Sequence, residues 1–407
     1  MKKILAMLMA LLMVLSMAAC GGNEAPEAEA PAVDAPEGAT VLKIGGVGPL
    51  TGGAAIYGNA AKHGAEIAVE EINALGGDFV FDLRYEDDAH DAEKSVNAYN
   101  TLKDWGMQIF LGSVTSTPGV ATSVEANADN MFYLTPSASS TDVLGGVENP
   151  LTGTVDIARK ANIFQMCFVD PNQGSASAQY IYEKHQGEKV AIIYKNDDVY
   201  SPGIYNSFAA KAAELNLNIV STTTFTTDSQ NDFSVQIADA KDKGADLIFL
   251  PMYYDAASLI LTQADAIGYD PTFFGVDGMD GILTVEGFDT TLAEGVILLT
   301  PFNADAEDEA TKSFVSKYQE AYGEVPNQFA ADAYDCVYAI YEALQGSGVA
   351  SDASYSDLCD LLVAKFTGSD FVFNGLTGED MTWDATGAVS KAPKGMVIEN
   401  GAYVGMD

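Results

Sequence analysis

The sequence predicts an α/β protein with two lobes, each built around a parallel sheet. Short apolar runs typical of buried strands alternate with helical patterns along most of the chain, and such alternation indicates parallel βαβ units. The chain has 407 residues, more than one modest core usually organises, so we expect two lobes. Hydroxyl-rich segments follow two of the apolar runs, at 112–116 and 135–139. Loops at the ends of parallel strands form the ligand crevice in open α/β sheets.

The first predicted elements alternate between strand and helix. We expect strands at 41–47, 79–86, 109–111 and 132–134, with helices at 91–104, at 118–128 and between the first two strands. That last helix carries Ala61, Ala65, Ala68 and Ile72 at the spacing of one buried face. A glycine pair at 76–77 ends it.

A second series of elements follows after about residue 170. We expect strands at 189–194, 219–225, 246–250 and 272–274, and helices after Pro202, from about Asp232 and at 255–267. A segment at 295–300 opens a third region, with helices near 308–322, 329–345 and 355–366 and β-like pieces around 371–383 and 389–398. The repeated strand–helix order predicts crossover connections within each lobe.

Residues 1–20 are typical of a targeting segment. Lys2 and Lys3 precede an uncharged apolar run at 4–19 that is short for a membrane span, and small residues precede Cys20. This pattern resembles the bacterial lipoprotein signal, which implies a lipid on Cys20; an ordinary cleaved signal with an incidental cysteine is the alternative. Residues 21–40 are rich in Ala, Pro and acidic residues, so we expect a disordered acidic tether.

The charge balance is strongly acidic, with 20 basic and 58 acidic residues and a net charge of −38. Such a chain is repelled by nucleic acid and by anionic lipid surfaces. We therefore expect no nucleic-acid partner, and membrane attachment only through the lipid on Cys20. The predicted location is extracytoplasmic, anchored to the cell membrane. The overall charge says nothing about the charge of a ligand.

The sequence contains no recognisable motif for a metal, a cofactor or catalysis. P-loop, dinucleotide-binding, CxxC, zinc and nucleophile-elbow patterns are absent. The acidic segment 86–91 lacks EF-hand spacing, so we expect a solvated loop there. We predict no cofactor, no metal and no enzymatic activity, which leaves a lipoprotein hydrolase as a disfavoured alternative. Cys167, Cys336 and Cys359 form an odd set for an exported protein, and a bridge between the last two stays open.

Several short motifs occur together in an order that resembles the leucine/isoleucine/valine-binding protein family. They are 48–52 (GPLTG), 57–58 (YG), 65–77 (AEIAVEEINALGG), 85–88 (YEDD), the two hydroxyl-rich segments, 170–174 (DPNQG), 232–234 (DFS), 275–278 (GVDG) and 376–378 (LTG). The resemblance implies the type I periplasmic-binding-protein fold, in which crossover strands join the lobes. We expect the N-terminal lobe at 41–169 plus 302–378 and the C-terminal lobe at 170–301 plus 379–407.

The resemblance also implies a set of ligand-binding positions. Ser116 and Ser139, with the backbone at Ser137 and Ala138, would bind an α-carboxylate, and Asp277 would bind an α-ammonium. The aromatic positions that would line or close the cleft are Tyr57, Tyr200, Tyr253 and Phe329.

Two departures from the family pattern bear on this site. Asp277 is shorter than the Glu of leucine-type receptors, and Gln165 stands where many relatives carry Arg. The first departure puts ligand size in doubt.

These residues suit an amino-acid ligand, because a zwitterion that leaves water needs a partner for each of its two charges. Each residue also has a plainer interpretation: Ser and Thr cap helices, many tyrosines lie in cores, and Asp277 precedes a glycine as turn residues do. The resemblance implies a substrate-binding lipoprotein of an ABC importer that delivers a small amino acid, favouring branched-chain types, to a permease. A receptor for another small amide or carboxylate, and a ligand sensor, are the alternatives.

Overall fold

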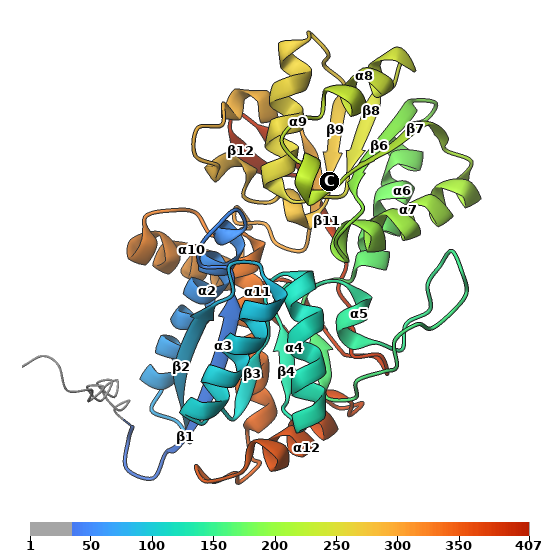
Figure 1. Ribbon diagram of the computed structural model, residues 1–407. Coiled ribbons are helices and arrows are strands. Elements are labelled where there is room, and N and C mark those ends of the chain that lie inside the picture. Colours follow the sequence, from blue (N-terminus) through green and yellow to red (C-terminus); the bar gives the residue numbers. More distant parts are fainter. Residues whose placement is uncertain (1–34, 407) are drawn as a thin grey trace, which may run out of the picture. The chain divides into compact units, whose positions relative to one another are not determined.

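Two sheets organise the chain, and each is flanked by helices (Figure 1). In the computed structural model, which describes residues 35–406, the first sheet has five strands in the order β2-β1-β3-β4-β5. The second has seven in the order β12-β11-β10-β9-β8-β6-β7. The predicted α/β class with two sheets is thus confirmed. The predicted signal segment, Cys20 and most of the predicted tether lie outside the described residues.

The first sheet is entirely parallel. Its strands are β1 (Thr40–Gly48), β2 (Phe79–Asp87), β3 (Ile109–Leu111), β4 (Tyr133–Thr135) and β5 (Ile163–Gln165), and its helices are α2 (Ala55–Ala74), α3 (Ala92–Trp105), α4 (Ser116–Asp129) and α5 (Thr141–Leu144). The predicted face of α2, Ala61, Ala65, Ala68 and Ile72, is fully buried. Strand β5 escaped prediction because it is only three residues long and follows a long irregular segment.

The second sheet is parallel except at one edge. Its strands are β6 (Lys189–Lys195), β7 (Asn218–Phe225), β8 (Leu247–Leu250), β9 (Thr272–Gly275), β10 (Ile297–Thr300), β11 (Lys394–Glu399) and β12 (Ala402–Gly405). The last two add antiparallel, as a hairpin that follows a long excursion of the chain. Its helices are α6 (Asp170–Lys184), α7 (Tyr200–Leu215), α8 (Ser234–Asp242) and α9 (Tyr254–Ala266), and the 3₁₀ turns are η1 (Thr227–Ser229), η2 (Asp277–Met279), η3 (Ile282–Thr284) and η4 (Thr290–Ala293).

The chain returns from the second sheet to the first after β10. Helices α10 (Glu309–Tyr322), α11 (Gln328–Leu344) and α12 (Tyr355–Phe366) follow β10, and α11 packs closely along α2. Gly64 permits this approach, because a Cβ there would overlap the carbonyl oxygen of Ala330. Helix α10 also contacts α2, and α12 contacts β3, so these helices pack beside the first sheet.

Residues 381–391 also pack beside the first sheet, although the predicted boundary assigns them to the C-terminal lobe. The indole Nε1 of Trp383 donates to the carbonyl oxygen of Gln165 at 2.9 Å, and its ring packs 4.5 Å from that of Phe366. Lys391 Nζ donates to Asp332 Oδ1 at 2.6 Å in a fully buried ion pair. The Trp383 indole and the Lys391 ion pair hold residues 381–391 in place, and both contact residues that are distant in the sequence.

The cysteine bridge that the sequence left open is not formed. Cys336 and Cys359 are both free and buried, as is Cys167. Among the helices of residues 35–406, none is both long and apolar enough to cross a membrane.

Candidate functional site

Six of the nine predicted binding residues line one small cavity. The lining comprises Tyr57, Val114, Thr115, Ser137, Tyr200, Tyr253, Asp277, Gly278 and Phe329, which come from elements of both sheets. Its volume is about 10 Å³, close to the smallest space that holds one water molecule. Ser116, Ala138 and Ser139 do not line the cavity and lie next to residues that do.

One part of the cavity lining is suited to a negatively charged group. Helix α4 begins here, and its N-cap residue Thr115 lines the cavity and provides no side-chain cap. No capping oxygen therefore offsets the partial positive charge of this helix N-terminus, and the Ser116 N–H lies beside the Tyr253 hydroxyl. Ser116 Oγ accepts from the backbone N–H of Ser140 at 3.2 Å. The Oγ of Ser139 is buried and has no hydrogen-bond partner. A buried hydroxyl without a partner favours a water or a ligand group there. The buried carboxyl of Asp170 lies beside it, and the Asp170 N–H donates to the Ser139 carbonyl oxygen at 3.0 Å.

The backbone at residues 137 and 138 differs from the expectation. The N–H groups of Ser137 and Ala138 donate to Thr135 Oγ1 at 3.2 and 2.9 Å, so they are not free for a carboxylate. Gln165 Nε2 donates to the carbonyl oxygens of Ala138 and Ser140. Gln165 therefore holds this loop through two of its carbonyl oxygens. The Thr135 hydroxyl occupies the amides of Ser137 and Ala138.

Asp277 belongs to another part of the lining. Its side chain is 3% exposed, and Tyr200 donates its hydroxyl hydrogen to Asp277 Oδ1. Gly278 N in turn donates to the Tyr200 oxygen at 2.9 Å. Burial raises the pKa of the Asp277 carboxyl to about 7, because a charged group is disfavoured away from water. No side chain with a positive charge lies within 4 Å of it among residues 35–406.

A second buried carboxyl lies close to Asp277. Asp170 begins α6, is fully buried, and neither of its oxygens has a hydrogen-bond partner. Burial and the nearby charge of Asp277 raise its pKa. Two carboxyls without a positive partner make this part of the site attractive to a cation.

Aromatic rings make up much of the rest of the lining. The Tyr57 ring centre lies 4.6 Å from that of Phe329 and 5.3 Å from that of Tyr253. Tyr253 stacks on Tyr200 with ring centres 4.6 Å apart and planes at 9°. Such walls exclude water and give an apolar body of a ligand a large contact area.

Tyr57 also connects elements of the two sheets. Its hydroxyl donates to the carbonyl oxygen of Gly278 and accepts from the N–H of Tyr254 at 3.2 Å. A Cβ at Gly278 would collide with the Tyr200 hydroxyl oxygen, so only glycine permits this close approach. These contacts hold the small cavity closed on both sides.

The acidic segment 86–91 is only partly the solvated loop that the sequence predicted, because Asp91 is exposed but Asp88 is not. Asp88 is fully buried, and burial raises its pKa to about 7. Nδ1 of His90 lies 2.8 Å from Thr115 Oγ1, and its ring packs 5.6 Å from that of Tyr253. Ala89 and His90 have positive φ angles, which turn the loop inward over the site. Among the described residues, no group of three or more His, Cys, Asp or Glu side chains could hold a metal ion.

Four residues in or beside the cavity were not predicted from the sequence as binding residues. Three of them, Val114, Thr115 and Gly278, line the cavity and lie within the family-like segments 112–116 and 275–278. The resemblance thus pointed to these segments but assigned no role to these three residues. His90 gave no such signal, because its inward position depends on backbone angles that the sequence pattern does not specify.

Comparisons with known proteins agree with this architecture. The sequence profile of the family described as periplasmic binding protein matches residues 41–392. A Leu/Ile/Val-binding protein of Rhizobium johnstonii is 28% identical over 77% of this chain and 81% of its own length. The leucine-specific-binding protein of Salmonella typhimurium is 27% identical over 85% of this chain and 87% of its own.

Solved structures extend the likeness to the fold. The branched-chain amino acid transporter substrate-binding protein LivJ of Streptococcus pneumoniae, solved in complex with isoleucine, matches with a TM-score of 0.77 and 27% identity. The match covers 90% of this chain and all of that one. The family profile spans most of the sequence, and the two sheets are mostly parallel, with the chain crossing between them. This chain therefore belongs to the periplasmic binding protein family and has its type I fold.

Proposed function

We propose that this protein is the extracytoplasmic substrate-binding component of an ABC importer, and that it binds a small amino acid between its two sheets. The observation that carries the proposal is the charge pattern of the cavity. The N-cap residue of an uncapped helix, Thr115, and the buried carboxyl of Asp277 both belong to its lining. That pattern complements the carboxylate and the ammonium of one zwitterion.

The cavity is too small for an amino acid in the present arrangement, so binding requires movement. At about 10 Å³ it holds no more than about one water molecule. We infer that the sheets separate, that the ligand enters, and that its ammonium takes the position beside Asp277 that the Tyr200 hydroxyl now occupies. Contacts from both sides then favour the closed form, which a permease would recognise.

The wall chemistry supports a branched aliphatic side chain as the ligand body. Tyr57, Tyr253 and Phe329 offer ring surface, and none of their neighbours in the lining carries a basic group. The similar proteins from Rhizobium and Salmonella are named for leucine, isoleucine and valine. The short Asp277 side chain admits a smaller amino acid, an amide or another small carboxylate as the alternative.

The remaining parts of the proposal concern membrane attachment and enzymatic activity. We propose that Cys20 carries a lipid that anchors the protein outside the cytoplasm, and that residues 21–40 act as the tether. A binding protein has no need of a catalytic centre, and we propose no enzymatic activity. Mass spectrometry of the protein extracted from membranes tests the lipid directly, and Cys20→Ser should release the protein in soluble form.

A thermal-shift screen of the purified protein tests the ligand class. The panel holds the twenty amino acids, simple amides and short carboxylic acids, each at several concentrations, because ligand-linked stabilisation grows with concentration over Kd. A concentration-dependent rise in Tm with leucine, isoleucine or valine supports the proposal. A rise with amides or acids alone keeps a receptor but removes the ammonium role of Asp277. No rise with any compound contradicts an amino-acid receptor.

A further inference from the structure

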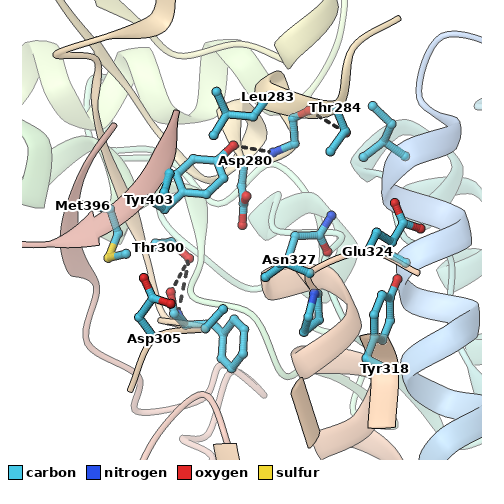
Figure 2. A pocket seen from close by; sticks show the side chains of 18 of the residues that line it. Asp280, Leu283, Thr284, Thr300, Asp305, Tyr318, Glu324, Asn327, Met396 and Tyr403 are labelled. Carbon is cyan, nitrogen blue, oxygen red and sulfur yellow. Dashed lines mark hydrogen bonds between the residues drawn. The ribbon is translucent and has the colours of Figure 1, made fainter. Parts of the chain in front are cut away.

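A second and much larger cavity lies between elements of the two sheets (Figure 2). Its volume is about 520 Å³, within the range of about 300–1,000 Å³ that small-molecule sites occupy. Ile56 of α2 and the segment 324–327 line one side, while residues 280–284 and the β11–β12 hairpin line the other. The site proposed above contributes no residue to this lining.

The polar groups of this cavity are acidic. Asp280, Asp305 and Glu324 contribute to the lining, which contains no Lys, Arg or His. Figure 2 shows these three side chains on different sides of one space. Within the described part of the chain, none of the three has a basic partner within 4 Å.

Asp280 distinguishes this cavity from the acidic surface of the protein. Its side chain is 6% exposed, whereas Asp305 and Glu324 are exposed. Its Oδ2 accepts from the backbone N–H of Gln328 at 3.1 Å, and the Gly281 N–H and the Tyr403 hydroxyl also lie beside the carboxyl. All of these donors are neutral, so none of them supplies a positive charge to match the buried carboxylate. Burial raises its pKa to about 6, so the carboxyl is ionised at pH 8.

The remaining lining is largely apolar. Ile56, Leu283, Phe302 and Met396 supply aliphatic and aromatic surface around the acidic groups. An inorganic cation would leave this surface without a contact, whereas an organic cation would cover it. The ligand that fits both features is a cation with an apolar body.

The wall between the two cavities is well defined. Tyr57 donates to the carbonyl oxygen of Gly278 on one side of this wall. Gln328 reaches both sides, because its N–H donates to Asp280 and its Nε2 donates to the carbonyl oxygen of Asp277 at 3.0 Å. A ligand in the larger cavity therefore does not touch the smaller one.

We propose that the larger cavity is a second binding site, selective for a small organic amine with an apolar body. The ammonium lies beside Asp280, with Asp305 and Glu324 at the mouth, and the body packs against Leu283 and Phe302. The proposal stands whether or not the smaller cavity binds an amino acid, since the two linings share no residue.

Isothermal titration of the purified protein at pH 8 with three probes of similar shape tests the charge requirement. They are 2-phenylethylamine, 2-phenylethanol and 3-phenylpropanoate, which carry a positive, a neutral and a negative head. We expect saturable one-to-one binding of the amine, at least tenfold weaker binding of the alcohol and none of the acid. Equal affinity for amine and alcohol, or no binding of the amine, overturns the proposal.

Three variants locate the amine. Asp280→Asn should weaken the amine at least tenfold, to the level of the alcohol, while Asp277→Asn should leave amine binding unchanged. Leu283→Trp should fill the cavity and abolish binding of both probes, with Leu361→Trp as a control that lies outside the lining. Loss of amine binding in Asp277→Asn, or its retention in Leu283→Trp with an unchanged melting curve, places the amine elsewhere and refutes the proposal.

Discussion

Replacing Asp277 with Asn should separate ligand affinity from stability. Asn keeps the shape of the side chain and an oxygen that accepts from Tyr200, so the packing of the site stays intact. The substitution removes only the negative charge that we pair with the ligand ammonium. Breaking a buried ion pair by removing one partner costs about 3–5 kcal/mol. The amino-acid ligand should therefore bind roughly 150- to 5,000-fold more weakly.

The same substitution should not destabilise the protein without ligand. The Asp277 pKa is raised from 3.8 to about 7, so the folded state binds a proton more tightly than the unfolded state. Its contribution to folding is present below about pH 4 and is lost as the pH rises towards 7. Asn carries no charge and escapes this loss, so the Tm of the variant at pH 8 should equal or exceed that of the wild type.

Calorimetric titration and thermal unfolding, run on the same preparations, check both expectations. Asp88→Asn is the matched control, because Asp88 is also buried and has a pKa raised to about 7 but does not line the cavity. It should keep ligand affinity within a few-fold of the wild type. If Asp277→Asn binds the ligand as tightly as the wild type, the ammonium does not pair with Asp277 and the reasoning fails.

Three further predictions concern pH and packing. Affinity for the amino acid should fall about tenfold between pH 8 and pH 6, because the ligand needs the ionised Asp277 and its pKa is about 7; titrations that give a pH-independent affinity contradict this. Lys391→Met should lower the free energy of unfolding by about 3–5 kcal/mol, since it leaves Asp332 buried without its partner, and urea denaturation with the double variant Lys391→Met/Asp332→Leu should recover most of that loss. Gly64→Ala should lower the unfolding free energy by about 1–3 kcal/mol or more, because its Cβ would overlap the carbonyl oxygen of Ala330; an unchanged urea midpoint would show that α2 and α11 pack less closely.

The sequence predicted most of the regular elements because their signals are local. The face that ends at Ile72 has a clear helical period, and the apolar runs at 109–111 and 132–134 became β3 and β4 within one residue. The helices near 308–322 and 355–366 were placed within one residue as well. The βαβ order predicted a parallel sheet in each lobe, but it did not predict the order of the strands within either sheet.

The elements that failed depend on distant partners. Residues 381–391 carry no strong period, and their position is fixed by Trp383 and Lys391 through residues more than fifty positions away. The antiparallel hairpin at the sheet edge arises because the chain arrives there from α12 and its irregular extension rather than from a crossover helix. Neither feature is visible in a local window.

The sequence predicted which residues lie near the cavity better than it predicted how their backbone groups are oriented. Six of the nine expected binding residues line one cavity, because motif order carries over when the fold is shared. That they bind a ligand stays a prediction. The inward amides at Ser137 and Ala138 depend on the hydroxyl of Thr135. The inward turn at His90 depends on left-handed backbone angles. Such details follow from three-dimensional contacts that a motif does not encode.

The most direct test of the two-ended charge match is a calorimetric comparison of leucine with two analogues that each lack one charge. Leucinol keeps the ammonium, and 4-methylpentanoate keeps the carboxylate, while both keep the branched body. We predict that leucine binds the wild-type protein at pH 8 with saturation, and that each analogue binds at least a hundredfold more weakly. Binding of either analogue with the affinity of leucine, or no binding of leucine at all, would contradict a site that holds both ends of a zwitterion.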